Sequence, residues 1–257
     1  MSITSEMNEE KWEIINRFIK NVKGRVADTS MSDSRHDGSA GHWLETQMGI
    51  AHNADNQPDL FGYEMKNATK SKTTFGDWSA DYYIFKDNYN YSIDRDRFLE
   101  IFGKPNEQKG MRFSWSGEPC PAINKINRFG QTLIVKDNDI YAIYNYSQDT
   151  RNNKQEIVPD NLKLDDIILA KWNHDSIKQK LERKFNNKGW FKCVIDKNGV
   201  YTSIVFGEPM TFDWWIKLVQ TGVVFFDSGM YQGNKRNYSQ WRANNSLWES
   251  LITSRYE

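Results

Sequence analysis

The sequence predicts an α/β or α+β domain built around a mixed β-sheet. Segments with apolar residues at helical spacing alternate along the chain with short apolar segments typical of strands. Apolar residues make up 38% of the 257 residues, which is enough for a sizeable core. There are only 6 prolines, and no internal repeat or Gly/Ser tract marks a linker. We therefore expect one compact domain over 1–257 that contains two lobes.

Helices are expected where apolar residues recur every three or four positions. The first begins near Asn8, carries Trp12, Ile15 and Phe18 on one face, and ends before Gly24. A polar segment rich in Ser, Asp and Gly follows and predicts a loop over 26–41. The expected helices cover 8–22, 42–50, 175–185, 211–220 and 246–252.

Strands are expected in short apolar segments bounded by turn residues. Two pairs are hairpins, because Asp, Asn and Gly fill the turns at 136–139 and 196–199. The pattern over 97–128 is irregular. The expected strands cover 60–66, 72–75, 82–85, 132–135, 140–144, 191–195, 200–206 and 223–226.

The segment Pro58-Asp59-Leu60-Phe61-Gly62-Tyr63-Glu64-Met65-Lys66 carries the clearest chemical signal. Side chains alternate along a strand, so Glu64 and Lys66 share a face, and Asp59 can curl back toward them from the strand entrance. Two carboxylates and the Met65 carbonyl would form an oxygen-rich site for Mg²⁺. The Lys66 side chain could then orient or deprotonate a water that attacks a phosphate, or neutralise the charge that develops on the phosphate. Glu45, on the preceding helix, could direct a further carboxylate at the same place.

The same residues have an ordinary structural interpretation. A D-x4-E-x-K pattern arises often by chance, and a Glu/Lys pair two residues apart on a strand is usually a solvated ion pair. The four histidines do not share a metal-ligand spacing. The two cysteines, Cys120 and Cys193, are too few for a disulfide framework or a cysteine zinc site.

Motifs along the chain resemble the PD-(D/E)xK nucleases and, more narrowly, the MvaI/BcnI-type restriction endonucleases, relatives of the MutH nickase. The Gly-rich segment 38–45 resembles the family loop that enters a helix bearing a Glu, here Glu45. Pro58-Asp59 with Glu64-Met65-Lys66, followed by Lys70-Ser71, is similar to the catalytic motif. Toward the carboxy terminus the matching features are 212–222, Asp227, Gly229-x-Tyr231-x-Gly233 and Trp241-Arg242. No match is found over 77–156.

This resemblance implies a mixed central sheet flanked by helices, with two lobes around a DNA cleft. The catalytic lobe would cover about 1–100 and 155–210, and the DNA-recognition lobe about 100–155 and 211–257. The implied activity is that of a type II restriction endonuclease, which hydrolyses DNA with Mg²⁺ at a short, interrupted, C/G-rich sequence. Asp59, Glu64, Lys66 and Glu45 would be the catalytic residues. A monomer and a cognate DNA methyltransferase as genetic partner are also implied.

Several residues are predicted to contact double-stranded DNA, although the net charge is zero, with 34 basic and 34 acidic residues. Local charge matters more than the total, and 228–247 holds basic residues without an acid. Polar and basic side chains next to the motif would hold phosphates, and Arg suits guanine. The predicted contacts are Lys70, Ser71, Lys72, Arg35, His42, Tyr231, Lys235, Arg236 and Arg242.

Two other functions remain open on the sequence. One is a MutH-like strand-specific nickase of DNA repair. The other is a non-catalytic carbohydrate- or protein-binding module, which the 14% aromatic content and 10 tryptophans would suit. Mean hydropathy is −0.77, and no apolar segment approaches the roughly 20 residues of a membrane helix. We therefore expect no membrane association and a cytoplasmic location.

Overall fold

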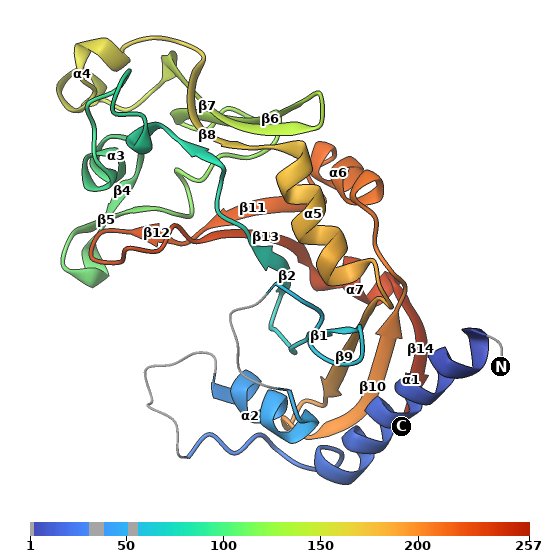
Figure 1. Ribbon diagram of the computed structural model, residues 1–257. Coiled ribbons are helices and arrows are strands. Elements are labelled where there is room, and N and C mark those ends of the chain that lie inside the picture. The colour runs from blue at the N-terminus through green and yellow to red at the C-terminus, as the bar shows by residue number, and fades with distance from the viewer. Residues whose placement is uncertain (1–2, 31–38, 51–55) are drawn as a thin grey trace. The chain divides into compact units, whose positions relative to one another are not determined.

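The computed structural model describes residues 3–30, 39–50 and 56–257 (Figure 1). The chain divides into two compact units. The first comprises Met1–Thr73, Lys180–Thr211 and Asn245–Glu257, and the second comprises Thr74–Gln179 and Phe212–Asn244. These bounds differ from those expected for the two lobes. Residues 74–100 and 155–179 lie in the second unit, and 245–257 lie in the first.

The first unit contains a four-stranded mixed sheet, as the sequence predicts. Its strands, in spatial order, are β1 (Glu64–Lys66), β9 (Trp190–Ile195), β10 (Tyr201–Gly207) and β14 (Ile252–Tyr256). β1 runs parallel to β9, whereas β9, β10 and β14 are antiparallel neighbours. The hairpin between β9 and β10 confirms the turn signal at 196–199. The expected helix at 246–252 is shorter, because α7 (Asn245–Ser250) ends before β14 begins.

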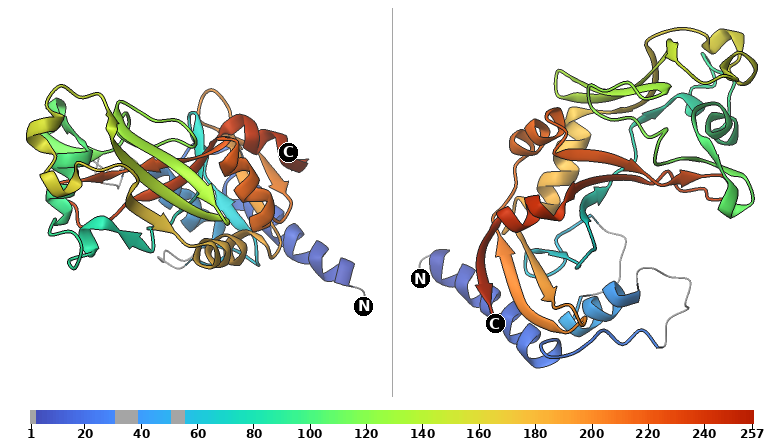
Figure 2. Two further views of the ribbon diagram at one scale, coloured as in Figure 1. Left: turned by 90° about the horizontal axis from the view of Figure 1, so that it is seen from above. Right: turned by 180° about the vertical axis from the view of Figure 1, so that it is seen from behind.

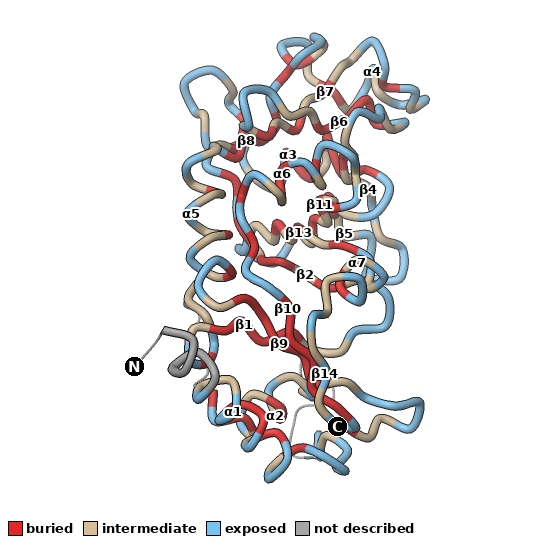
Figure 3. The backbone as a smooth tube through the Cα atoms, turned by 90° about the vertical axis from the view of Figure 1, so that its right-hand side faces the viewer, coloured by how far each residue is buried: buried red, intermediate tan, exposed pale blue. Residues whose placement is uncertain are grey.

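One face of this sheet forms the core of the first unit. It packs against α1 (Ile3–Asn21) and α2 (Ser39–Met48), and the two helices are tied together where Arg17 Nη1 donates to Met48 O at 3.1 Å. Figure 3 shows the buried course of β1, β9 and β10. The buried residues of this core include Ile14, Phe18, Leu44, Met48, Met65, Phe191, Cys193, Ile204 and Phe206.

The opposite face of the sheet carries the polar motif. Glu64 pairs in register with Trp190 and Lys66 with Lys192, so these four side chains share a face. Trp190 packs edge-on against Trp248 of α7, with ring centroids 5.2 Å apart. Gly207 makes this packing possible, because a Cβ there would lie 2.2 Å from the Trp190 ring.

The second unit contains further antiparallel pairs (Figure 2). One sheet has the order β3 (Tyr82–Tyr83), β8 (Ile167–Trp172), β7 (Asp139–Asp149) and β6 (Phe129–Lys136). A second has β12 (Met230–Tyr231), β5 (Arg112–Trp115) and β4 (Lys104–Asn106), and a third has β11 (Val224–Ser228), β13 (Ser239–Asn244) and β2 (Lys72–Asp77). Its helices are α3 (Arg95–Phe102), α4 (Lys154–Ile157), α6 (Phe212–Gln220) and the first half of α5 (His174–Phe185).

The segment 97–128, whose pattern is irregular, is well ordered into elements. α3 begins at an N-cap, since the Asp94 side chain accepts from Arg97 N at 2.7 Å. Its apolar face buries Phe98, Leu99 and Phe102. β4 and β5 follow as a short hairpin. Among the described residues, no helix has the length and apolar character needed to cross a bilayer.

Candidate active centre

A tight turn brings Asp59 next to Glu64. Leu60 N donates to Tyr63 O at 3.0 Å, and Tyr63 N donates back to Leu60 O at 2.9 Å. The two residues between them have positive φ, 49° at Phe61 and 83° at Gly62, as a two-residue hairpin turn requires. The expected strand at 60–66 is therefore a turn followed by the short strand β1. The Asp59 side chain closes the arrangement by accepting from Met65 N at 2.8 Å.

Glu64 and Lys66 meet on one face of β1, as alternation along a strand predicts. Lys66 Nζ donates to Glu64 Oε1 at 2.8 Å, and both residues are buried, with relative exposures of 5% and 2%. The ammonium lies 4.8 Å from the Phe185 ring centroid and 5.8 Å from that of Trp248. Aromatic walls from α5 and α7 thus shield this pair from water.

Lys184 is a member of the site that the sequence analysis does not identify. From the last turn of α5, its Nζ lies 3.0 Å from Glu64 Oε1. The available signal is its spacing, because it follows the buried Leu181 by three residues and precedes the buried Phe185. Lys192 is also buried beside Lys66, and its Nζ lies 3.4 Å from Glu249 Oε1.

Burial and like charge perturb the protonation of these groups. Partial burial and, after it, the nearby charge of Glu64 raise the pKa of Asp59 to about 7, while the Met65 N–H and the charges of Lys184 and Lys66 oppose this rise. Burial also lowers the pKa of Lys66, against the opposing attraction of Glu64. Two carboxylates that resist being charged together favour a bound cation.

The donor set fits a hard metal ion. Glu64 Oε2 is buried and, among the described residues, has no hydrogen-bond partner. This oxygen, the Asp59 carboxylate and the Met65 carbonyl are the oxygen ligands that Mg²⁺ accepts, with water completing its shell. The described part of the chain contains no group of three His, Cys, Asp or Glu side chains that could hold a metal ion. A metal here would therefore keep several waters.

Glu45 lies near the carboxyl end of β1 without joining that group of acids. α2 approaches the strand end so closely that a Cβ on Gly41 would lie 2.7 Å from Asn67 Nδ2. Glu45 follows Gly41 by one helical turn and shares its face of the helix. The carboxylate contacts His42, with Nδ1 and Oε2 3.4 Å apart, and the His42 side chain is 68% exposed. A role for Glu45 in catalysis stays a prediction.

Asn245 fixes the loop that follows β1. Its backbone N donates to Ser71 O at 2.9 Å, and its side-chain Nδ2 donates to Thr69 O at 2.8 Å. Thr73 Oγ1 donates to Asn245 Oδ1 at 2.9 Å. Lys70 and Ser71 are exposed, and Lys72 is half-buried. The loop thus presents Lys70 from a fixed backbone, while the predicted contact Arg35 lies outside the described residues.

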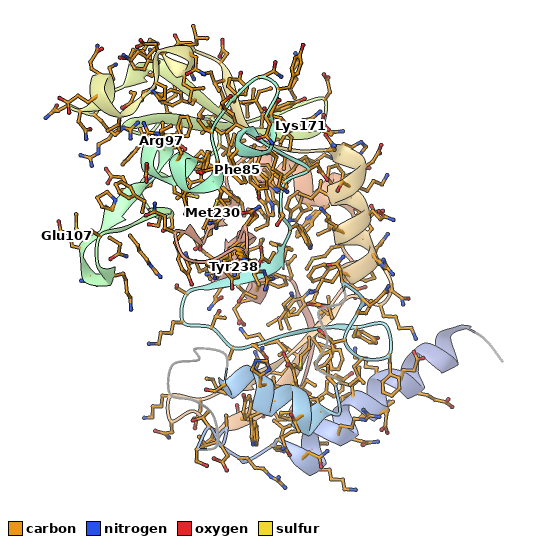
Figure 4. The ribbon with its side chains drawn as sticks, turned by 60° about the vertical axis from the view of Figure 1, so that its left-hand side comes forward. Phe85, Arg97, Glu107, Lys171, Met230 and Tyr238 are labelled. Atoms are coloured by element: carbon orange, nitrogen blue, oxygen red, sulfur yellow. The ribbon has the colours of Figure 1, made fainter. Side chains whose placement is uncertain are left out.

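The loop 231–237 of the second unit holds three of the residues predicted to contact DNA: Tyr231, Lys235 and Arg236. It lies between Met230 and Tyr238, which are labelled in Figure 4. Arg95 of α3 binds across it, because its guanidinium donates to Asn237 Oδ1, Tyr231 O and Arg236 O at 2.8, 3.1 and 3.1 Å. Lys235 is exposed on this loop.

Charged neighbours contact three of the predicted DNA-binding residues: a basic one contacts Tyr231, and acidic ones pair with Arg236 and Arg242. The Arg112 guanidinium lies 3.7 Å from the centroid of the Tyr231 ring. Arg236 pairs with Asp77 at 2.9 Å. Arg242 pairs with Asp227 across β11 and β13 at 3.3 Å and donates to Gln240. Both arginines are therefore oriented by acidic partners that the local charge count leaves out.

Comparisons with known proteins point in one direction. A family model described as LlaMI restriction endonuclease matches residues 22–256. The chain is 52% identical over 267 residues to the "Type II restriction enzyme ScrFI" of Lactococcus lactis subsp. cremoris, covering 96% of this chain and 98% of that protein. Among solved structures, "Restriction endonuclease MvaI-cognate DNA substrate complex" has a TM-score of 0.58 at 15% identity, covering 100% of this chain and 98% of that one. The structural likeness supports a restriction-endonuclease-like fold.

Proposed function

The chain belongs to the LlaMI restriction endonuclease family, and on that basis we propose that Asp59, Glu64 and Lys66 form the active centre with which it cuts DNA. The protein is a type II restriction endonuclease, a site-specific deoxyribonuclease. Enzymes of this kind generally depend on a metal ion. The observation that carries the proposal is the buried, unpartnered Glu64 Oε2 beside Asp59 and Lys66. We assign the ion as Mg²⁺, because the donors are all oxygens.

The chemistry is hydrolysis of a phosphodiester bond. When bound, Mg²⁺ supplies positive charge to the scissile phosphate and lowers the pKa of a bound water. Asp59, Glu64 and the Met65 carbonyl would hold the ion. Lys66, kept at the site by Glu64, orients the attacking water and offsets the negative charge that develops on the phosphate. Phe185 and Trp248 exclude bulk water from that ammonium.

A plasmid cleavage assay with and without Mg²⁺ tests this assignment. We expect linear DNA as the end product, with ends at one short sequence. Accumulation of open-circular DNA would instead indicate a strand-specific nickase. Unchanged cleavage in both Asp59→Ala and Lys66→Ala would refute the active centre proposed here.

We further propose that Arg236, Arg242, Tyr231 and Lys235 contact duplex DNA, with Lys70, Ser71, Lys72, Arg35 and His42 on phosphates near the cut. Arg side chains held by acidic partners favour guanine contacts, and so a C/G-rich, interrupted site. A monomer located in the cytoplasm and a cognate methyltransferase that protects host DNA complete the proposal. Sequencing the ends of digested DNA identifies the site, and the elution volume at working concentration gives the oligomeric state.

We expect Arg95→Met to weaken recognition while the chemical step stays intact. Arg95 supports 231–237 through three hydrogen bonds, and bonds to a charged group contribute about 1.5–3 kcal/mol. KM for DNA should rise about ten-fold or more, with kcat within about three-fold of the unmodified enzyme. Arg95→Lys, which keeps the charge, should restore part of the affinity. A fall in kcat of about ten-fold with an unchanged KM would contradict this role of Arg95.

We also expect cleavage at limiting Mg²⁺ to fall as the pH drops below about 7. The Asp59 pKa of about 7 means that metal binding must displace a proton near neutral pH. The rate should fall about ten-fold per pH unit below the pKa, and saturating Mg²⁺ should move the transition to lower pH. Initial rates from pH 5.5 to 8.5 at two Mg²⁺ concentrations measure this. A profile that ignores the Mg²⁺ concentration contradicts it.

A further inference from the structure

Two lysines from different elements share a single oxygen of the buried carboxylate. Lys66 Nζ donates to Glu64 Oε1 at 2.8 Å, and Lys184 Nζ lies 3.0 Å from the same atom. The other oxygen, Oε2, is buried and has no hydrogen-bond partner among the described residues. Glu64 therefore presents one neutralised oxygen and one available oxygen.

Lys66 and Lys184 have unequal freedom to leave Glu64. Lys66 extends from the same strand as Glu64, and its side chain is 6% exposed beneath the rings of Phe185 and Trp248. Lys184 reaches in from the last turn of α5, and its side chain is 19% exposed. Of the two lysines, Lys184 is therefore the more exposed to solvent and the less enclosed partner of Glu64.

We propose that Lys184 is a positioning residue, the internal counter-ion of Glu64, and that it sets how tightly the active centre binds its metal ion. The inference deepens the proposed function and rests on it. Without metal, Lys184 and Lys66 together balance the charge of a carboxylate that is 2% exposed. When a divalent cation binds Oε2, two positive charges approach each other across one carboxylate. Coulomb repulsion between them weakens metal binding.

Removing the charge of Lys184 should therefore tighten metal binding. A cation next to a carboxylate makes that carboxylate less attractive to a metal ion. When the cation is removed, the carboxylate attracts the metal ion more strongly. A purely structural role for Lys184 predicts the reverse, because a loosened Glu64 would bind metal more weakly. The sign of the change distinguishes the two roles.

The test titrates the DNA-free protein with Mg²⁺ and, separately, with Ca²⁺. Calorimetry gives the dissociation constant, and the fluorescence of the tryptophans gives a second readout through Trp248. Lys184→Met removes the charge, Lys184→Gln keeps a hydrogen-bond donor without the charge, and Lys184→Arg keeps the charge. Arg183→Met removes the same charge from the neighbouring, exposed position on α5 and is the matched control.

We expect both uncharged variants to bind metal on the order of ten-fold more tightly than the unmodified protein, while Lys184→Arg and Arg183→Met stay within about two-fold. The Mg²⁺ concentration for half-maximal cleavage should fall in parallel. Unchanged or weaker binding in Lys184→Gln, with its melting temperature preserved, overturns the proposal. If Lys184→Met does not fold, the Gln and Arg variants still decide. Failure of the unmodified protein to bind any divalent ion would instead overturn the proposed function.

Discussion

Asp59→Asn should abolish cleavage and, at the same time, make the folded protein more stable at pH 8. The amide is a poor metal ligand, so we expect cleavage to fall by about 10³-fold or more. Its oxygen can still accept from Met65 N, so the turn at 61–62 should survive. Loss of activity together with a gain in stability separates a role in catalysis from misfolding.

The direction of the stability change follows from the Asp59 pKa, which is about 7 in the folded protein against 3.8 for an unperturbed aspartate. A raised pKa means that the folded state binds the proton more tightly than the unfolded state. The destabilising contribution of Asp59 is absent below about pH 4, grows between pH 4 and 7, and is complete above pH 7. Because Asp59 is partly open to solvent, which screens its charge, removing it should stabilise the metal-free protein at pH 8 by about 1 kcal/mol, less than the pKa shift alone would imply.

Urea denaturation in EDTA at pH 4.5 and pH 8 measures this gain. The variant and the unmodified protein should differ clearly at pH 8 and little at pH 4.5. Asp175→Asn, at a side chain that is 99% exposed, is the control and should change stability by about 0.5 kcal/mol or less at both pH values. An Asp59→Asn protein that is less stable than the unmodified one at pH 8 contradicts the raised pKa of this carboxyl group.

Lys66→Met should stop cleavage while leaving both the fold and DNA binding in place. Methionine has nearly the length of the lysine stem and suits the walls formed by Phe185 and Trp248. Glu64 keeps a cationic partner in Lys184, so the buried carboxylate is not left unpaired. A single charge-stabilising donor contributes about 10²–10³-fold to a catalytic rate. We expect the cleavage rate of Lys66→Met to fall by about 10³-fold, because water is excluded from this site.

Single-turnover cleavage in Mg²⁺ and duplex binding in Ca²⁺ measure the two parts of this prediction. The dissociation constant for DNA should stay within about three-fold, because the grip on phosphates lies elsewhere. Lys66→Arg is the companion variant, and it should also be slow, since a planar guanidinium fits poorly in the space of an ammonium. More than a tenth of the original rate in Lys66→Met would remove Lys66 from the mechanism.

The catalytic segment could be predicted from the sequence because its geometry is local. Alternation along a strand places Glu64 and Lys66 together, and a turn of two residues returns Asp59 to them. Lys184 belongs to the same site but comes from a helix far along the chain. Helical spacing identifies its neighbours Leu181 and Phe185 as buried, yet it does not say which strand they cover. That contact depends on tertiary packing.

Tertiary contacts also explain why the charge pattern of the second unit could not be predicted fully from the sequence. A count of charges along 228–247 indicates a basic surface, whereas the structure pairs Arg242 with Asp227 and Arg236 with Asp77. Those partners are set by strand register and by an element far earlier in the chain. α3 is missed in an irregular pattern because it has only 8 residues. β14 is missed because its few residues continue the pattern of the preceding helix.

The hairpin turn at Phe61 and Gly62 makes the position of Asp59 depend on the number of residues in this loop. φ is positive at both positions, and Lys188 N donates to Gly62 O at 3.2 Å, which links the turn to the segment between α5 and β9. One residue more or less would send the aspartate carboxylate to the other side of the sheet. The side chains within the turn can change during evolution, but we expect selection against insertions and deletions between Asp59 and Glu64.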